Sequence, residues 1–178
     1  MEAAEARLDE VRAAPADHGR VELIVRRPEV EAREVVDEAT LDADGGLVGD
    51  NWSVKPSLKT GAPNPEAQLT VMNARVAALV AGDDRENWAQ AGDQLYVDLD
   101  LSHANLPPGT RLQVGEAVIE VSAEPHLGCG KFLKRFGLDA QKLVNSTVGR
   151  ELNMRGINTR IVSGGVVRTG DPIAKLDA

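Results

Sequence analysis

The only cysteine of the chain lies in a segment whose residue types could support chemistry, Pro125 to Lys131. Glycines flank Cys129 on both sides and would let a ligand approach its sulfur closely. The segment follows a predicted strand and precedes a predicted helix, and a helix dipole, with Lys131 and His126 nearby, would stabilise a thiolate. The alternative is an inert core cysteine. We predict an exposed, functional thiol at a strand-to-helix junction.

Two other kinds of chemistry are open to this segment, a zinc site and a cysteine protease. His126 and Cys129 have the spacing of half a zinc site, but the only other histidines are His18 and His103. Structural zinc takes four ligands, usually paired closely in sequence, so a carboxylate would have to complete the site. A protease needs a general base beside its thiol, and a histidine so near in sequence rarely has the right geometry. We therefore favour a thiolate site over both.

Two further groups of residues could bind a phosphate or a polar ring. Arg85 supplies a planar fork that suits phosphate, and Asn87 supplies an amide that can read a polar ring. An arginine that follows two aspartates could also form an exposed ion pair. Gly149-Arg150, together with Arg155, Asn158 and Arg160 around Gly156, offers the same chemistry, and the glycines give access to the backbone. We predict that Arg85, Asn87 and at least one of Arg155 and Arg160 line one cavity with Cys129.

Charge is distributed unevenly along the chain. The net charge is -8, yet residues 125–170 contain eight lysines and arginines against two acids. That segment is therefore basic and the remainder strongly acidic. An acidic protein with one basic segment can present a local anion site, although a solvated helix face would look the same in sequence.

Length and composition bound the class of protein. The 178 residues suit one domain, and 42% hydrophobic residues can bury a core that must be aliphatic, because aromatics are only 3%. Aromatic platforms for single-stranded nucleic acid are therefore improbable, and we expect no nucleic-acid partner. No apolar run could span a bilayer, the N-terminus does not resemble a secretory signal, and one cysteine cannot form an internal disulfide. We expect a cytoplasmic protein without a membrane partner.

Many short strands with glycine turns between them predict a mainly β protein, a barrel with a few short helices. A helical extension is expected over residues 1–17, where a helix at 2–13 is ended by Pro15, and the barrel over 18–178. Residues 41–65 are expected to form a long ordered loop, and Tyr96 to face solvent from a half-exposed strand. Helices are predicted at 73–80 and, broken at Gly137, between 132 and 144. Strands are predicted at 20–27, 68–72, 95–101, 111–114, 117–122, 157–162, 166–168 and 173–176.

Taken in order, these motifs resemble the MOSC domain, the C-terminal module of molybdenum cofactor sulfurases. The resemblance rests on the run from Asp98 to Val121, on the position of Cys129, on the Arg85-x-Asn87 pair and on the ending from Arg155 to Pro172. It is good over roughly residues 85–175 and looser over 20–80. The combination of hairpin, cysteine and Gly-Asp-Pro ending is specific.

The resemblance implies a β-barrel that binds the molybdenum cofactor or carries sulfur as a persulfide on Cys129. In cofactor-bound relatives the cysteine sulfur ligates molybdenum, as suits a soft thiolate. The cofactor carries a phosphate, which would account for the basic segment. The resemblance thus assigns Cys129 a catalytic and metal-ligating role. The cofactor-binding residues it suggests are Arg85, Asn87, His126, Lys131, Arg155, Asn158 and Arg160.

The chain departs from the family in two places. Many stand-alone members carry a His-Gly-Gly triplet where this chain has Asp44-Gly45-Gly46. The aminotransferase-like domain of complete sulfurases is also missing, so mobilisation of sulfur from free cysteine does not carry over. Two hypotheses follow: a molybdenum cofactor protein, which could reduce N-hydroxylated compounds or serve in cofactor sulfuration, and a non-catalytic domain that holds sulfur or an anionic ligand. The expected partner is an anionic cofactor or a sulfur donor or acceptor protein.

Overall fold

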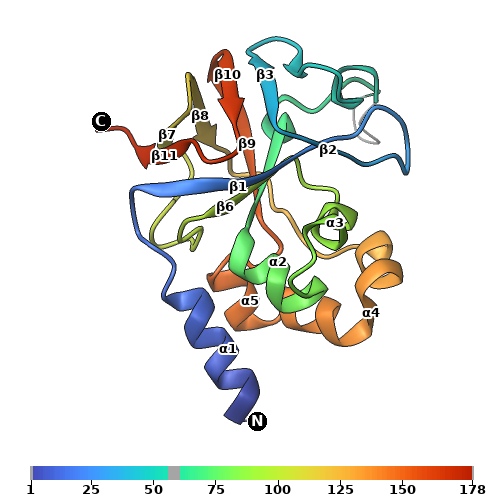
Figure 1. The fold of residues 1–178 in the computed structure, drawn as a ribbon, viewed down its shortest axis with the longest axis vertical. Helices are drawn as coiled ribbons and strands as arrows, with labels where there is room; N and C mark the ends of the chain where they lie inside the picture. The colour runs from blue at the N-terminus through green and yellow to red at the C-terminus, as the bar shows by residue number, and fades with distance from the viewer. Residues whose placement is uncertain (1, 56–60, 178) are drawn as a thin grey trace.

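A computed structural model describes residues 2–55 and 61–177, with side chains from residue 6 onward. Strands occupy the upper half of the molecule in Figure 1 and helices the lower half. The helices are α1 (Glu2–Arg12), α2 (Ala74–Ala81), α3 (Arg85–Trp88), α4 (Gly130–Asn145) and α5 (Thr147–Glu151), with short 3-10 turns at Trp52–Val54, Pro65–Ala67 and Ala89–Ala91. The strands are β1 (Gly19–Arg26), β2 (Glu34–Val36), β3 (Glu38–Asp42), β4 (Gly46–Leu47), β5 (Leu69–Asn73), β6 (Leu95–Asp98), β7 (Arg111–Val114), β8 (Ala117–Val121), β9 (Ile157–Ser163), β10 (Gly165–Arg168) and β11 (Pro172–Lys175).

Seven strands close into a barrel in the order β11-β7-β8-β9-β5-β6-β1, because β1 pairs with β11 through Gly19 and Ile173. Strand β2 extends one edge of this sheet beside β1. Strands β5 and β6 pair in parallel, and the neighbouring barrel pairs described are antiparallel. The expectation of a closed barrel without a doubly wound parallel sheet is confirmed.

The residues expected to form one long loop contain more regular structure than the sequence indicated. Strand β3 pairs with β10, and β4 pairs with β3 through Leu47 and Leu41, so a small three-stranded sheet stands beside the barrel. Gly46 turns the chain at a φ of 81°, where an added Cβ would meet the ring of Trp52 at 3.0 Å. Residues 56–60 of the expected loop lie outside the described residues.

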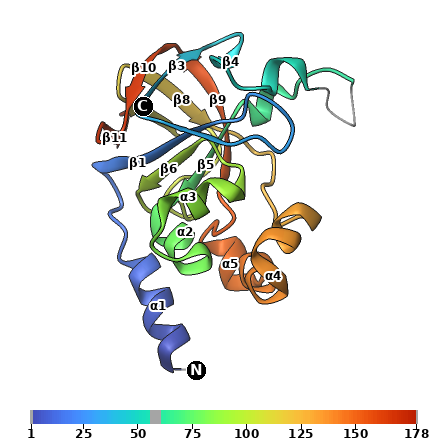
Figure 2. The same ribbon diagram turned by 45° about the vertical axis from the view of Figure 1, so that its right-hand side comes forward.

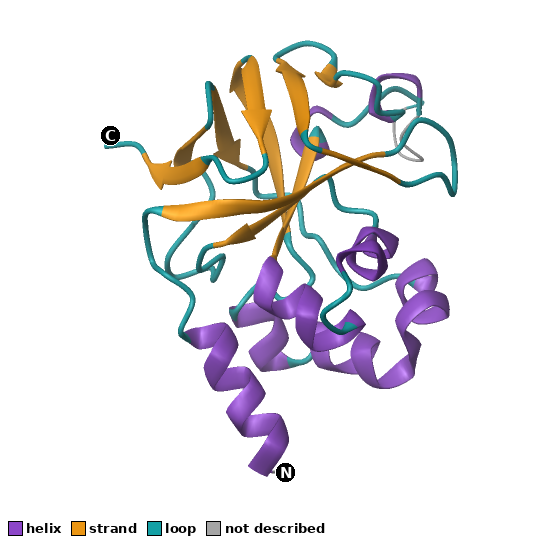
Figure 3. Ribbon diagram, in the orientation of Figure 1, coloured by secondary structure: helices purple, strands orange, loops and turns teal. Residues whose placement is uncertain are grey.

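The barrel has apolar residues on both of its faces. One cluster fills the interior, with Val21, Leu69 and Leu95 among its members. A second cluster lies between the outer face and the helices, where Met72 and Tyr96 meet residues such as Phe132. Figures 2 and 3 show α2, α3, α4 and α5 gathered at one end of the strands.

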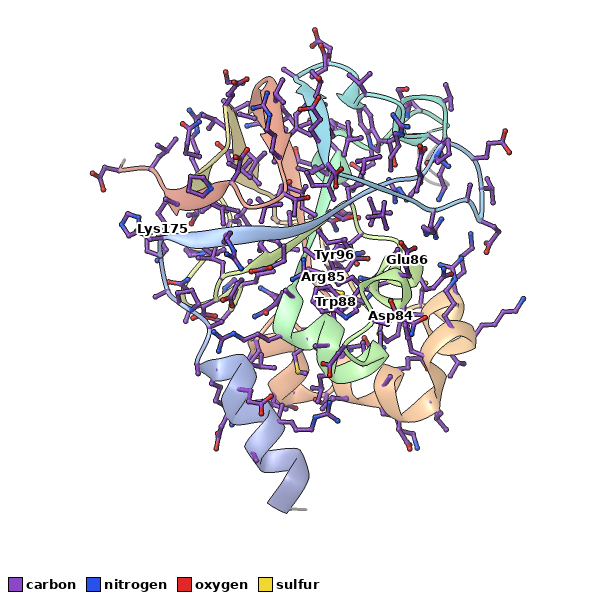
Figure 4. The ribbon with its side chains drawn as sticks, viewed as in Figure 1. Asp84, Arg85, Glu86, Trp88, Tyr96 and Lys175 are labelled. Carbon is purple, nitrogen blue, oxygen red and sulfur yellow. The ribbon has the colours of Figure 1, made fainter. Side chains whose placement is uncertain are left out.

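Tyr96 is fully buried, so the expectation that it faces solvent is wrong. Alternation along its strand was identified correctly, but the helices cover the face that the sequence predicted to be exposed. Its hydroxyl donates to the carbonyl of Trp88 at 2.7 Å, which satisfies the polar end of a buried ring. Figure 4 shows Tyr96 close to Trp88 under α3.

Local sequence signals set the positions of α2 and α4 close to those predicted. Asn73 caps α2 by accepting the backbone N–H of Arg75 at 2.8 Å. Helix α4 is interrupted at Gly137, whose φ of 89° favours glycine. Helix α1 contributes Val11 to the outer apolar cluster. No described helix has both the length and the apolar character needed to cross a bilayer.

Candidate functional site

Cys129 is exposed and stands immediately before α4, after the loop that follows β8. Its backbone is extended, at a φ of -105° and a ψ of -177°, and it occupies the N-cap position of the helix. Asn145 fixes the preceding turn, because its side chain accepts from the N–H of Gly128 and donates to the carbonyl of Gly128. The predicted exposure of the thiol and its place at a strand-to-helix junction are both confirmed.

The surroundings of Cys129 favour the thiolate. Partial desolvation acts to raise the pKa of the thiol, but the backbone N–H groups of Phe132 and Lys131 and the charge of Arg155 outweigh it, so the pKa lies below its ordinary value. Unpaired N–H groups at a helix N-terminus attract negative charge. A thiolate is the form that attacks sulfur or binds a soft metal.

Titration of the single thiol tests this effect directly. We expect the absorbance of the Cys129 thiolate at 240 nm to appear at lower pH in the folded protein than in the same chain unfolded in guanidinium chloride. The unfolded chain is the control, because it has the same thiol without the helix N-terminus. A folded-state pKa equal to or above the unfolded one would contradict the interpretation.

A buried polar unit lies beneath the loop that carries Cys129. Asp93 is fully buried and contacts two cations or potential cations, with Oδ1 2.9 Å from Nε2 of His126 and Oδ2 2.5 Å from a guanidinium nitrogen of Arg155. Burial acts to raise the pKa of Asp93, but Arg155 and His126 outweigh it and lower the pKa to about 2. Arg155 also donates to the carbonyl of Ala91 and lies 5.1 Å from the ring centre of Phe132. We call Asp93, His126 and Arg155 the buried triad.

His126 is held in its neutral form within the buried triad. Desolvation, and secondly the charge of Arg155, lower its pKa, and these effects outweigh the attraction of Asp93. Asp93 is ionised and has no hydrogen to donate, so Nε2 of His126 must carry the hydrogen that the two share. The other ring nitrogen, Nδ1, is therefore an acceptor.

The lowered pKa of His126 predicts a loss of stability in mild acid. The unfolded chain, with a histidine pKa near 6.5, takes up a proton more readily than the folded one. The free energy of unfolding should therefore fall as pH drops below 6.5, by up to about 1.4 kcal/mol per pH unit. Urea denaturation at pH 7.0 and 5.5 measures this. We expect His126→Gln to flatten the dependence; equal slopes in the parent and the variant would contradict the prediction.

A cavity of about 310 Å³ opens beside His126. Its lining includes Trp52 and Pro125, which are largely apolar, and the polar residues His126 and Asn158. Arg27 and Lys55 supply positive charge to its wall. The cavity has the size and mixed lining typical of small-molecule sites.

Lys55, on the wall of this cavity, has three cations within electrostatic range: Arg27 on the same wall, Arg33, and Lys131 in the first turn of α4. Desolvation chiefly lowers the pKa of Lys55, and Lys131, Arg27 and Arg33 lower it further, against an opposite effect of Asp50. The same is true of Arg33, whose pKa is lowered by desolvation and then by Arg135 and Arg27. We call these four residues the cationic cluster.

Carboxylates neutralise only part of the cationic cluster. Buried Asp50 accepts from the Arg27 guanidinium at 2.8 and 2.9 Å, and Glu31 lies 3.5 Å from Lys131. Among the described residues, no carboxylate lies within ion-pair distance of Arg33, and its Nε is buried without a hydrogen-bond partner. Like charges are costly to gather unless an anion neutralises them, so the cluster is electrostatically suited to an anion.

The structure places Arg85 and Asn87 on α3, away from the wall of the 310 Å³ cavity. The guanidinium of Arg85 pairs with Glu22 of β1 at 2.9 Å and lies 5.4 Å from the ring centre of Trp88. Asn87 lines another cavity, together with Arg135. The charge of Arg85 is thus already paired, and a role of either residue in cofactor binding stays a prediction.

The remaining predicted residues divide into two groups. His126 and Asn158 line the 310 Å³ cavity, Lys131 belongs to the cationic cluster, and Arg155 lies beneath them in the buried triad. Arg160 instead pairs with Glu120 on the neighbouring strand and lines a different cavity with Gln68. The charge of Arg155 acts on the Cys129 thiol, but neither of these two residues, nor Arg160, lines the 310 Å³ cavity, so the predicted shared cavity wall is not seen.

Sequence reasoning missed Asp93, Arg27, Arg33 and Lys55. Each reaches the site from a different segment, and none stands in a motif. The one available signal was the pair Asp93-Gln94 directly before an apolar strand, since polar residues at a strand entrance are often buried with partners. Gln94 is indeed fully buried and accepts from Thr70 while it donates to Asp50 at 3.2 Å.

Comparison with known proteins identifies the class. The sequence model of the MOSC domain matches residues 60–174, well over half of the chain. The chain belongs to the MOSC domain family. No curated protein matches the sequence significantly. Among the described residues, no three histidine, cysteine, aspartate or glutamate side chains are grouped to hold a metal ion, so the zinc alternative receives no support.

Solved structures share the fold at low sequence identity. The YuaD protein from Bacillus subtilis is 20% identical, with 88% of this chain and 94% of that chain covered and a TM-score of 0.61. YiiM from Escherichia coli is 23% identical, with 89% and 70% covered and a TM-score of 0.58. YiiM from Geobacillus stearothermophilus is 13% identical, with 89% and 75% covered and a TM-score of 0.59. At these sequence identities the similarity shows a shared fold and nothing beyond it.

Proposed function

We propose that this MOSC protein binds the molybdenum cofactor, with the Cys129 sulfur as a ligand of molybdenum and the cationic cluster as the site of the cofactor's phosphate. The observation that carries the proposal is an exposed thiol with a lowered pKa two residues before Lys131, a cation that lies within electrostatic range of Lys55 on the cavity wall. Molybdenum takes a soft ligand such as a thiolate, and a phosphate takes cationic donors. The protein offers both kinds of group.

The residues of the site fit such a group in three respects. The thiolate of Cys129 is directed to solvent at a helix N-terminus, so a bulky ligand can reach it. Arg33 has donors without a carboxylate partner among the described residues. The Oδ1 atom of Asn158, on the cavity wall, is buried without a hydrogen-bond partner and could accept from a ring N–H. When bound, the cofactor supplies two-electron redox chemistry at molybdenum, which would suit the reduction of N-hydroxylated compounds.

The test is metal and mass analysis of the protein made in a cofactor-producing host. We expect close to one molybdenum and one pterin per chain after mild purification. A persulfide mass on Cys129 without molybdenum would favour the alternative, a non-catalytic sulfur carrier, for which the exposed thiol is equally suitable. Protein with neither molybdenum nor added sulfur would overturn the proposal.

Substitution of the cationic cluster should weaken loading without unfolding the protein. Arg33→Gln removes a charge with no described carboxylate partner, so an anion should lose a charge-assisted hydrogen bond, typically about 1.5–3 kcal/mol or about 10- to 100-fold in affinity. Arg111→Gln is the matched control, because Arg111 pairs with Glu120 on the surface of β7. Molybdenum content and the thermal midpoint are measured for both. Equal molybdenum in the two variants would contradict the assignment.

A further inference from the structure

Glu31, in the loop between β1 and β2, reaches across to the first two turns of α4. One of its carboxylate oxygens lies 2.6 Å from a guanidinium nitrogen of Arg135, and the other lies 3.5 Å from Nζ of Lys131. Lys131 is a member of the cationic cluster. A carboxylate of the protein therefore occupies a cation that the proposed function assigns to a phosphate.

The cations around Glu31 outnumber its single negative charge. Arg135 is the chief cause that lowers the pKa of Glu31, and Lys131 adds to the effect, so the carboxylate is ionised. Its charge also reaches Arg33: desolvation, then Arg135 and Arg27, lower the pKa of Arg33, and Glu31 acts in the opposite direction. Glu31 is thus a counter-ion that only partly neutralises its surroundings.

The two carboxylates beside the cationic cluster differ in how firmly they are held. The side chain of Asp50 is fully buried and accepts from the guanidinium of Arg27, from the backbone N–H of Trp52 and from Gln94. Glu31 is 62% exposed. Ion pairs at the surface contribute little to stability, because water and salt screen them. Of the two carboxylates, Glu31 is therefore the one that an incoming anion could displace.

The position of Arg135 does not depend on Glu31 alone. Its side chain is 15% exposed, and it also donates to the carbonyl of Gln90 at 2.9 Å. Glu31 itself has a φ of 68°, a left-handed conformation that is uncommon for residues other than glycine. The backbone of the loop therefore gives little support to this contact, whereas the guanidinium would remain available after Glu31 had moved away.

We propose that Glu31 is a displaceable counter-ion, which occupies Lys131 and Arg135 until a dianionic phosphate group takes its place and releases the loop between β1 and β2 from α4. The inference rests on the proposed function in taking the cationic cluster as a phosphate site. An anion binds only the fraction of molecules in which Glu31 has moved away, so the contact lowers the apparent affinity by that fraction. By the same linkage, binding of the anion loosens the loop.

The probe is inorganic phosphate at pH 8, where it is a dianion, titrated at constant ionic strength into ¹⁵N-labelled protein that contains no molybdenum. We expect Glu31→Gln to bind phosphate about 2- to 5-fold more tightly than the parent, which is the factor that an exposed ion pair implies. Glu29→Gln is the matched control, because it removes the same charge from the same loop at an exposed residue that forms no ion pair with another described residue. It should bind as the parent does. Equal affinity of the two variants, weaker binding by Glu31→Gln, or no binding by the parent and Glu31→Gln would overturn the proposal.

The amide chemical shifts give a second readout of the same titration. In the parent, phosphate should shift the amides of Val30 and Glu31 together with that of Lys131, since the loop leaves as the anion arrives. In Glu31→Gln the shift at Lys131 should remain and the shift at Val30 should shrink, because the loop is already released. A shift at Lys131 alone in the parent would overturn the proposal.

These titrations can fail or succeed independently of the proposed function. A parent that acquires no molybdenum in a cofactor-producing host would contradict the proposed binding of the cofactor. The affinities of the parent, Glu31→Gln and Glu29→Gln for inorganic phosphate would still be measured and would still decide whether Glu31 is displaced.

Discussion

Cys129→Ser is expected to abolish molybdenum loading and leave the fold unchanged. A serine hydroxyl is not ionised at neutral pH, so the N–H groups at the start of α4 would face a neutral oxygen in place of a soft thiolate. Because the thiol is exposed, its replacement leaves no cavity, and stability should change by no more than about 0.5 kcal/mol. Molybdenum per chain, measured on parent and variant from the same cofactor-producing host, should fall to background.

A second variant tests whether the thiol must stand at position 129 or whether any thiol in the same loop is sufficient. Leu127 is 46% exposed and lies two residues before Cys129. In the double variant Cys129→Ser with Leu127→Cys, a thiol is present but lies outside the helix N-terminus. We expect no recovery of molybdenum. Full loading of Cys129→Ser would show that the thiol is structurally and chemically dispensable, and the proposed function would then be wrong.

The barrel and the position of the thiol could be predicted because their signals are local. The hairpin of β7 and β8 was visible as two alternating runs around Gly115-Glu116, and the structure pairs Val114 with Ala117 across that turn. The glycines beside Cys129 and the break at Gly137 likewise act within a few residues. Such features depend on backbone conformation and pattern, which a single sequence displays.

The remainder of the site depends on contacts between distant segments. Asp93 meets His126 and Arg155, which follow it by 33 and 62 residues. Arg27 and Lys55 belong to other segments again, and a charged residue in a loop looks the same whether it faces solvent or a cavity. Tyr96 shows the same limit, since its strand pattern was correct and only the covering helices decided its burial. Arg27, Arg33 and Lys55 lie outside the basic segment after Pro125, so the charge excess there did not point to them.

Asp93→Asn is expected to destabilise the fold by about 3–5 kcal/mol, because removal of one partner leaves a buried charge uncompensated. Arg155 has a side chain only 7% exposed, and it would keep its charge against a neutral amide. His126 would lose the carboxylate that orients its ring. Urea denaturation at pH 7 measures the change in the free energy of unfolding. We also expect the Cys129 loop to become more open to thiol reagents, since His126 and Arg155 lie beneath it.

Two further substitutions show whether the lost stability comes from a buried, unpaired charge or from the loss of an ion pair as such. Asp98→Asn breaks the pair with Arg75, whose two side chains are about a third exposed, and should cost no more than about 1 kcal/mol. Adding Arg155→Met to Asp93→Asn removes the orphaned charge and should recover part of the lost stability, because a buried ion pair can be replaced by apolar packing more easily than it can be halved. If Asp93→Asn costs as little as Asp98→Asn, the buried triad is not what holds the loop.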